Sequence, residues 1–467
     1  MIKFLLEHAD RPAVSFHMPG HKGSALYRRY GYGEWLDKFM DCDITEIPGA
    51  DNLFQTEGVL KDIQDRYAAL YDVKNSYLLV NGTSGGLIAA VLAAVQAGKK
   101  LIMAKNCHKS IFNALTLGHI DPVYAHPLID DEYGITGAVE PSEIEQLLRE
   151  NPEAEAVILP SPNYYGICSD IRSIAEVTHR AGRVLIVDQA HGAHLHFFHK
   201  FGAGKGMPLS AEAGGADITV GSTHKTLASL TQSAVLNLCS DRVDRYALED
   251  KLQAVESTSP SYVLMASLDI NAELLEQHGP VLMNEWRINI DWFYEQAKNI
   301  PAMKIMTADM MDITKINIDM SAYGISGAEL ERSLREKDIF TELNTGDILM
   351  CMTGIGSSRE DLGRLLSALN ETAQNHETVS QAEKKTRIKL PASGRMHPVP
   401  GHKEPVPLEE AAGRICAYSI IPYPPGAPLV CPGEEISEET VRYIRSLREA
   451  GSNVIGVNDK GQIMVGK

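Results

Sequence analysis

The chain has 467 residues, a length that predicts about two to four structural units around at least one large core. Its formal net charge of −17 at pH 7 argues against nucleic acid or an anionic membrane as the main partner and is compatible with a cationic substrate. The seven cysteines are scattered and include no C-x-x-C pair, so we expect reduced thiols in a cytoplasm rather than disulfides or a zinc site. The sequence shows no signal peptide and no apolar stretch long enough to span a bilayer.

Two polar segments precede the first long helical pattern. Residues 17–23 read His-Met-Pro-Gly-His-Lys-Gly, a turn that is either a ligand-facing edge or a polar surface loop. Residues 41–57 form an acidic loop, which is either a solvated face or the best local site for a cationic group. Apolar residues at helical spacing then predict a helix over about 58–72. The carboxylates of the acidic loop are Asp41, Asp43, Glu46, Asp51 and Glu57.

From residue 76 onward, apolar strands alternate with helical patterns. This alternation is typical of a mainly parallel sheet covered on both faces, in which ligands bind at the carboxyl ends of the strands. The sequence therefore predicts an α/β fold with a seven-stranded, mainly parallel sheet. The expected strands are 76–80, 100–104, 121–125, 156–160, 184–188, 216–221 and 233–239, and the expected helices lie near 86–97, 109–117, 141–149 and 170–181.

The first strand end carries a glycine-rich turn over residues 80–86, which leads into a helix expected from residue 87. Backbone N–H groups at a helix start, together with the hydroxyls of Thr83 and Ser84, are suited to bind a phosphate. The turn is neither a P-loop nor the dinucleotide-binding fingerprint. Glycine-rich turns are common, so a phosphate site and a plain turn both stay open at this point.

Two further strand ends carry side chains suited to an aromatic cofactor. His108 follows the strand 100–104 and either lies flat against a ring or faces water. The strand 184–188 ends at Asp188, where an unpaired carboxylate is costly unless it meets a cation such as a protonated pyridine nitrogen. Ala190 is small enough for a ring to pack over it. We expect no metal site, because the histidines that follow share no regular face. They are His191, His194, His196 and His199.

The other motifs are organised around the segment Ser-Thr-His-Lys at residues 222–225, directly after a buried strand. A lysine at this place has a desolvated stem and an amine that faces a cleft. Burial lowers the pKa of a lysine, and the neutral amine is the form that attacks an aldehyde. Lys225 is therefore either a Schiff-base lysine or a solvated lysine after a strand, and the remaining motifs favour the first interpretation.

A phosphate cradle, an aspartate and a lysine at successive strand ends are what a pyridoxal-phosphate enzyme needs. The chain resembles the bacterial ornithine/lysine/arginine decarboxylases, which are pyridoxal-phosphate enzymes of fold type I, the aspartate-aminotransferase-like fold. It looks like the short form of that family, without an N-terminal receiver-like wing domain, and it departs at Gln189, where the family more often has Glu. The matching segments are Phe16-His-Met-Pro-Gly-His-Lys, Asn81-Gly-Thr-Ser, Asn106-Cys-His-Lys-Ser, Val187-Asp-Gln-Ala-His-Gly, Ser222-Thr-His-Lys, and Tyr423-Pro-Pro-Gly-Ala-Pro with Pro432-Gly-Glu434.

The resemblance implies a role for each of these positions. Lys225 would carry pyridoxal phosphate as a Schiff base, Asp188 would pair with its ring nitrogen, and His108 would stack on its ring. Ala190 and His191 would line the other face or edge of the ring. Thr83, Ser84, Ser222 and His224 would serve the phosphate. The candidates for the substrate side chain are Glu434, Glu46 and Asp51, with Asp43 and Glu57 as further carboxylates of the acidic loop.

We expect four parts along the chain. A major domain with an N-terminal arm covers 1–300 and ends in long helices near 242–255 and 262–299. Residues 301–375 form a small α/β domain with the pattern strand–strand–helix–strand–helix, in which Gly354-Ile-Gly356 is a plain turn. Residues 376–412 form a charged, proline-rich linker, and 413–467 form a second small unit with a rigid proline loop at 423–428.

The expected function is decarboxylation of a basic amino acid, and the short-form resemblance favours arginine, which gives agmatine for polyamine biosynthesis, over lysine or ornithine. An aminotransferase on the same fold would share the cofactor residues and stays an alternative. A non-catalytic relative is disfavoured because Lys225, Asp188 and His108 are all present. We expect at least a homodimer, in which residues 41–57 or 17–23 reach the partner's cofactor.

Overall fold

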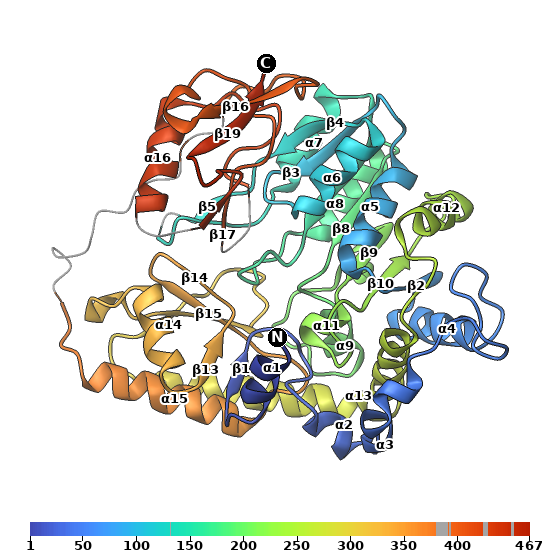
Figure 1. Ribbon diagram of the computed structural model, residues 1–467, viewed down its shortest axis with the longest axis vertical. Coiled ribbons are helices and arrows are strands. Elements are labelled where there is room, and N and C mark those ends of the chain that lie inside the picture. The colour runs from blue at the N-terminus through green and yellow to red at the C-terminus, as the bar shows by residue number, and fades with distance from the viewer. Residues whose placement is uncertain (131, 380–390, 392–393, 424–427, 450–452) are drawn as a thin grey trace.

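The computed structural model describes the whole chain except residues 131, 380–390, 392–393, 424–427 and 450–452. Seven strands form its central sheet in the order β2-β10-β9-β8-β7-β3-β4 (Figure 1). Strand β10 runs antiparallel to both of its neighbours, and the remaining pairs are parallel. The predicted α/β fold is therefore confirmed. The strands are β2 (Asn75–Leu79), β3 (Lys100–Ala104), β4 (Asp121–Ala125), β7 (Ala154–Pro160), β8 (Val184–Asp188), β9 (Ile218–Gly221) and β10 (Ala234–Leu238).

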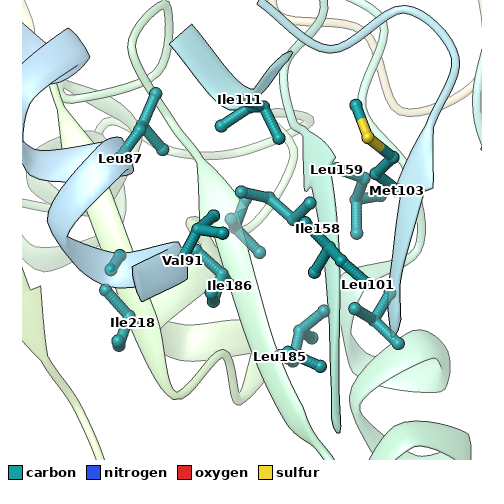
Figure 2. Close-up of a cluster of buried hydrophobic side chains, with 14 of the residues drawn as sticks. Leu87, Val91, Leu101, Met103, Ile111, Ile158, Leu159, Leu185, Ile186 and Ile218 are labelled. Atoms are coloured by element: carbon teal, nitrogen blue, oxygen red, sulfur yellow. The ribbon is translucent and has the colours of Figure 1, made fainter. Parts of the chain in front are cut away.

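Helix α5 (Gly82–Ala94) packs its apolar face on this sheet, with Leu87 and Val91 beside strand residues such as Ile186 (Figure 2). It begins five residues earlier than expected, because glycines are poor helix formers and the sequence pattern placed them in a turn. Packing requires a glycine here, since a Cβ on Gly86 would lie 2.5 Å from a methyl group of Leu79. The other main helices of this unit are α4 (Val59–Tyr71), α6 (Lys109–Gly118), α7 (Pro141–Glu150), α8 (Ile171–Arg180) and α12 (Arg245–Val255).

The long helix α13 (Tyr262–Ala297) joins the major unit to the smaller unit that follows it. Its first half packs in the core with α4, where Leu268 and Leu275 are fully buried. Its last turns supply Phe293 and Ala297 to the core of the small unit. One continuous helix therefore contributes side chains to both cores and fixes the position of one unit against the other.

The small unit contains a four-stranded antiparallel sheet in the order β11-β12-β15-β14. One strand that was not predicted, β13 (Ile339–Thr341), lies outside this sheet and pairs in parallel with β1 (Val14–Phe16). The side chains of Val14 and Phe16 are buried in the core of the small unit, so the N-terminal arm docks there (Figure 1). The other elements are β11 (Lys304–Ile305), β12 (Lys315–Asp319), α14 (Gly327–Arg335), β14 (Leu343–Thr345), β15 (Ile348–Met352) and α15 (Arg359–Gln374).

The C-terminal unit begins earlier than expected. Strand β16 (Lys403–Pro407), which lies inside the expected linker 376–412, pairs antiparallel with β19 (Gln462–Gly466). Its two prolines argued against a strand, but β16 has a free edge, where a residue without an N–H group is tolerated. Residues 380–390 and 392–393 of the linker and 424–427 of the proline loop lie outside the described residues. The unit also contains β17 (Ile421–Tyr423), α16 (Glu438–Glu449) and β18 (Asn453–Ile455).

Short elements complete the described chain. None of the helices in the described part is both long enough and apolar enough to cross a membrane. The short elements are α1 (Ile2–Ala9), α2 (Ala25–Arg29), α3 (Gly33–Asp37), η1 (Phe39–Cys42), β5 (Ile129–Asp130), β6 (Ile135–Thr136), α9 (Leu195–Lys200), α10 (Ala211–Gly214), α11 (Thr223–Thr226), η2 (Ser321–Tyr323) and η4 (Leu408–Glu410).

Candidate active site

Lys225 lies in the single turn α11, directly after the carboxyl end of β9. Its Nζ atom lies 2.8 Å from Nε2 of His191. Burial lowers the pKa of the Lys225 amine, and the charge of Lys315 lowers it further, whereas Asp188 and Glu342 oppose the shift. A lowered pKa increases the share of neutral amine, which is the nucleophilic form.

Two glycine segments pack in succession against the Lys225 turn. The N–H of Gly20 donates to the carbonyl of His224 at 2.8 Å, and the N–H of Gly356 donates to the carbonyl of Gly20 at 3.0 Å. A Cβ on Gly20 would lie 2.5 Å from the carbonyl oxygen of Leu227, and one on Gly354 would lie 2.6 Å from Cα of Gly20. Residues 354–356 are therefore part of the wall of the site and not the plain turn that we expected.

Residues 17–23 dock on the Lys225 turn of their own chain. Besides the Gly20 contacts, Lys22 Nζ donates to the carbonyl of Met352 at 3.2 Å and to the carbonyl of His17. Burial lowers the pKa of Lys22 to about 8. These contacts place the segment at its own chain's site, and its reach to a partner's cofactor stays a prediction.

Asp188 ends β8 as a buried carboxylate that is 5% exposed. Its Oδ1 accepts a hydrogen bond from the N–H of Ala190 at 3.0 Å, and no basic side chain of the described residues lies within ion-pairing distance. Burial raises the pKa of this carboxyl, and the charge of Lys225 opposes the shift. A buried carboxylate without an ion pair suits a cationic ring nitrogen as its partner.

The contacts of Gln189 explain why this chain departs from the family pattern at that position. Its Nε2 donates to both carboxylate oxygens of Glu212, at 2.8 and 2.9 Å. Its Oε1 accepts a hydrogen bond from the N–H of Ala211 at 2.6 Å. A glutamate at position 189 would bring a second negative charge against Glu212, so the amide fits this neighbour.

Two histidines border the space between Lys225 and Asp188. His108 is the N-cap of α6, and its ring nitrogen accepts a hydrogen bond from the N–H of Ser110 at 3.3 Å. Burial lowers the pKa of His108 to about 4, and the charge of Lys225 adds to the shift. Burial also lowers the pKa of His191 well below its usual value. Both shifts favour the neutral form of the ring, which is suited to pack against an aromatic cofactor.

The residues expected to bind a phosphate lie at the N-terminus of α5. Thr83 and Ser84 lie in its first turn, and the Ser222 hydroxyl donates to Thr83 Oγ1 at 3.3 Å. His224 borders the same place, with its Nδ1 atom 2.7 Å from the carbonyl of Ser233. Free N–H groups, the positive end of the helix dipole and these hydroxyls fit a phosphate group. The residues present therefore fit pyridoxal phosphate at both of its ends.

The first three of the carboxylates named for the substrate have other partners or lie exposed. Glu434 is buried and accepts hydrogen bonds from Lys105 Nζ at 2.8 Å and from the N–H of Cys431 at 2.9 Å. Asp51 accepts N–H groups at the start of α4, and Glu46 lies exposed on the acidic loop. Their role in substrate binding stays a prediction.

The remaining histidines of the segment after β8 have separate partners. His194 Nε2 lies 3.1 Å from the carboxylate of Asp312, and His196 Nε2 lies 3.2 Å from that of Asp72. His199 Nε2 lies 3.0 Å from a backbone carbonyl. In the described part of the chain, no three potential metal ligands come together.

Two residues of the site were missed by the sequence analysis. The Tyr164 hydroxyl donates to Glu342 Oε1 at 3.0 Å, and the Tyr164 ring lies 4.4 Å from the ring of His191. Tyr164 lies just after the carboxyl end of β7. The strand-end position that singled out the other motifs could therefore have identified it. Glu342 gave no local signal, because it lies between two short strands of the small unit.

The comparisons with known proteins agree with this geometry. A family model described as the major domain of Orn/Lys/Arg decarboxylases matches residues 1–313, and the model of their C-terminal domain matches 373–462. The arginine decarboxylase of Bacillus subtilis (strain 168) is 34% identical, with 99% of this chain and 96% of that protein covered. The arginine decarboxylase of Bacillus anthracis is 30% identical, with 97% and 94% covered.

A solved structure of the constitutive lysine decarboxylase of E. coli has a TM-score of 0.76 at 20% identity, covering 100% of this chain and 81% of that chain. A solved L-threonine transaldolase of Pseudomonas fluorescens in its internal aldimine state has a TM-score of 0.61 at 14% identity, covering 80% and 86%. These two structures show the fold. The family models and the Bacillus relatives show that the chain belongs to the Orn/Lys/Arg decarboxylase family and is a pyridoxal-phosphate-dependent amino-acid decarboxylase, with the fold of the type I enzymes.

Proposed function

We propose that this enzyme converts arginine to agmatine and CO2, a reaction of polyamine biosynthesis. The observation that carries the proposal is the near-full-length similarity to Bacillus proteins that are arginine decarboxylases. We further propose the cytoplasm as its compartment, which its seven unpaired cysteines support. Activity in a cell fraction other than the cytosolic one would contradict that assignment.

We propose the following division of labour at the site. Pyridoxal phosphate, when bound, supplies the electron sink that makes the bond from Cα to the carboxylate breakable. Lys225 holds the cofactor through its amine, Asp188 keeps a proton on the ring nitrogen, and His108 packs against the ring. Ala190 and His191 border the ring on the other side. The phosphate is held by the start of α5 with Thr83, Ser84, Ser222 and His224.

The substrate is tested by comparing kcat/KM for arginine, lysine and ornithine, with CO2 and the matching amine as measured products. We expect arginine to be the best substrate. If lysine or ornithine exceeds arginine by about tenfold, equivalent to about 1.4 kcal/mol of transition-state preference, the arginine assignment fails while the decarboxylase assignment stands. Formation of a keto acid without CO2 would instead indicate an aminotransferase.

The role of Lys225 is tested by chemical trapping. The purified protein should be yellow, and borohydride should fix the cofactor irreversibly on the peptide that contains Lys225, as mass spectrometry would show. Lys225→Ala should lose this covalent attachment because the amine that forms it is removed. Trapped cofactor in the Lys225→Ala protein would show that the assignment is wrong.

The role of Asp188 is tested with Asp188→Asn, which keeps the size of the side chain and removes its charge. We expect kcat to fall at least about 100-fold, which corresponds to about 2.7 kcal/mol, with little change in melting temperature. The control is Asp217→Asn, a fully buried aspartate that accepts hydrogen bonds from Leu185 N and His179, away from Lys225. It should lower the melting temperature and keep kcat per bound cofactor. Near-normal turnover of Asp188→Asn would refute the role.

We propose that the working unit is at least a homodimer in which residues 41–57 reach the partner's active site. This loop has no core of its own, and it carries exposed apolar side chains, including Ile47 at 52% exposure. Sedimentation should show a dimer or larger assembly at assay concentration. Ile47→Asp should weaken assembly and activity together, whereas the control Ile288→Asp, at an exposed position on α13, should change neither. A fully active monomer would defeat the proposal.

A further inference from the structure

A carboxylate of the small unit lies in the wall of the active site. Glu342 accepts the Tyr164 hydroxyl at Oε1 and the N–H of Met18 at Oε2, each at 3.0 Å. These two hydrogen bonds join three segments that are far apart in the sequence: the small unit, the loop after β7 and the N-terminal arm. In the described part of the chain, no lysine or arginine forms an ion pair with Glu342. The carboxylate is therefore oriented by two neutral donors, the Tyr164 hydroxyl and the Met18 N–H.

The ring of His191 has an unusual shortage of hydrogen-bond partners. Its Nε2 atom lies 2.8 Å from Lys225 Nζ, but its Nδ1 atom is buried and has no hydrogen-bond partner among the described residues. The second ring nitrogen is normally what fixes the orientation of a functional histidine. Lys315 Nζ donates to the carbonyl of His191, which fixes the backbone but does not orient the ring.

The Tyr164 ring restrains His191 in place of such a hydrogen bond. The two rings lie 4.4 Å apart at an angle of 48°. The Tyr164 hydroxyl is in turn held by Glu342. A continuous chain of contacts therefore runs from Glu342 through Tyr164 and His191 to the amine of Lys225.

We propose that Glu342 is a positioning residue for the reaction: it fixes Tyr164 against His191 and thereby holds His191 at the Lys225 amine. Loss of this anchor weakens the restraint on the Tyr164 ring and, through it, the restraint on His191. The Lys225 amine then spends less time in the orientation in which it meets the cofactor. The effect on turnover rests on the proposed function, whereas the effect on cofactor attachment does not.

The test uses Tyr164→Phe, Glu342→Gln and the double variant. Two quantities are measured: the rate at which added pyridoxal phosphate attaches covalently to the apo-protein, followed by absorbance, and kcat and KM with arginine. Each single variant should slow attachment and lower kcat by about tenfold, as for loss of one hydrogen bond to a charged group, with KM changed less than about threefold. The double variant should be no slower than the slower single variant, because both changes break the same chain of contacts.

The matched control is Tyr165→Phe. Tyr165 is the next residue, and its hydroxyl donates to Thr345 Oγ1 at 3.1 Å, away from His191. This variant loses a hydroxyl of the same kind, and its attachment rate and kcat should stay within about twofold of wild type.

Several results would overturn the proposal. If Tyr164→Phe attaches the cofactor at the wild-type rate, its hydroxyl does not position the site. If the rate losses of the two single variants multiply in the double variant, the two residues act independently. If Glu342→Gln loses activity with arginine, keeps activity with the uncharged analogue citrulline and attaches cofactor normally, Glu342 binds the substrate cation instead. A wild-type protein that releases no CO2 from any amino acid refutes the proposed function, and the attachment rates still decide the role of Glu342.

Discussion

The site depends on one steric constraint: Gly20 packs between the backbone of the Lys225 turn and the backbone at residues 354–356, and neither Gly20 nor Gly354 has space for a Cβ atom. The approach is close enough for the N–H and C=O groups of three segments to bond one another, where unpaired backbone groups would be costly. Because the obstructing atoms belong to the backbone, they cannot move aside as a flexible side chain would. The N-terminal arm, the major sheet and the small unit are therefore assembled around one lysine.

Two buried aspartates show how the protein separates structure from chemistry. Asp312 is fully buried, and its charge is balanced by Lys315 at 2.6 Å and His194 at 3.1 Å, which together hold the pKa of the Asp312 carboxyl far below its usual value. Asp188 is almost as buried, but its own chain offers it a backbone N–H and no ion pair within the described residues. The charge of the first carboxylate is balanced by the fold, whereas the second has no ion-pair partner among the described residues, as its proposed pairing with a ring nitrogen requires. This contrast supports a cofactor role for Asp188 better than its burial alone.

Carboxylates were the least predictable part of the site. The sequence analysis selected Asp51 and Glu434 because they lie in an acidic loop and beside a proline loop. In the structure, Asp51 accepts backbone N–H groups at the start of α4, and Glu434 meets Lys105. Glu342, which was not selected, bonds Tyr164, whose ring packs against His191 next to Lys225. Negative charge in a sequence indicates that a partner is needed but does not indicate which partner the fold supplies.

The sequence by itself determined the sheet, because continuous apolar strands alternating with helices have few other ways to bury both faces, and β3, β4 and β8 have the bounds that were predicted. It also placed Lys225 and Asp188 at one edge, since neighbouring parallel strands end there. Only the tertiary structure decided which segments close the site: Tyr164 and Glu342 are 178 positions apart, and their contact depends on how the small unit packs on the major one. Local periodicity reports which side of an element is buried, whereas the packing of distant units depends on shape complementarity that no short stretch of sequence contains.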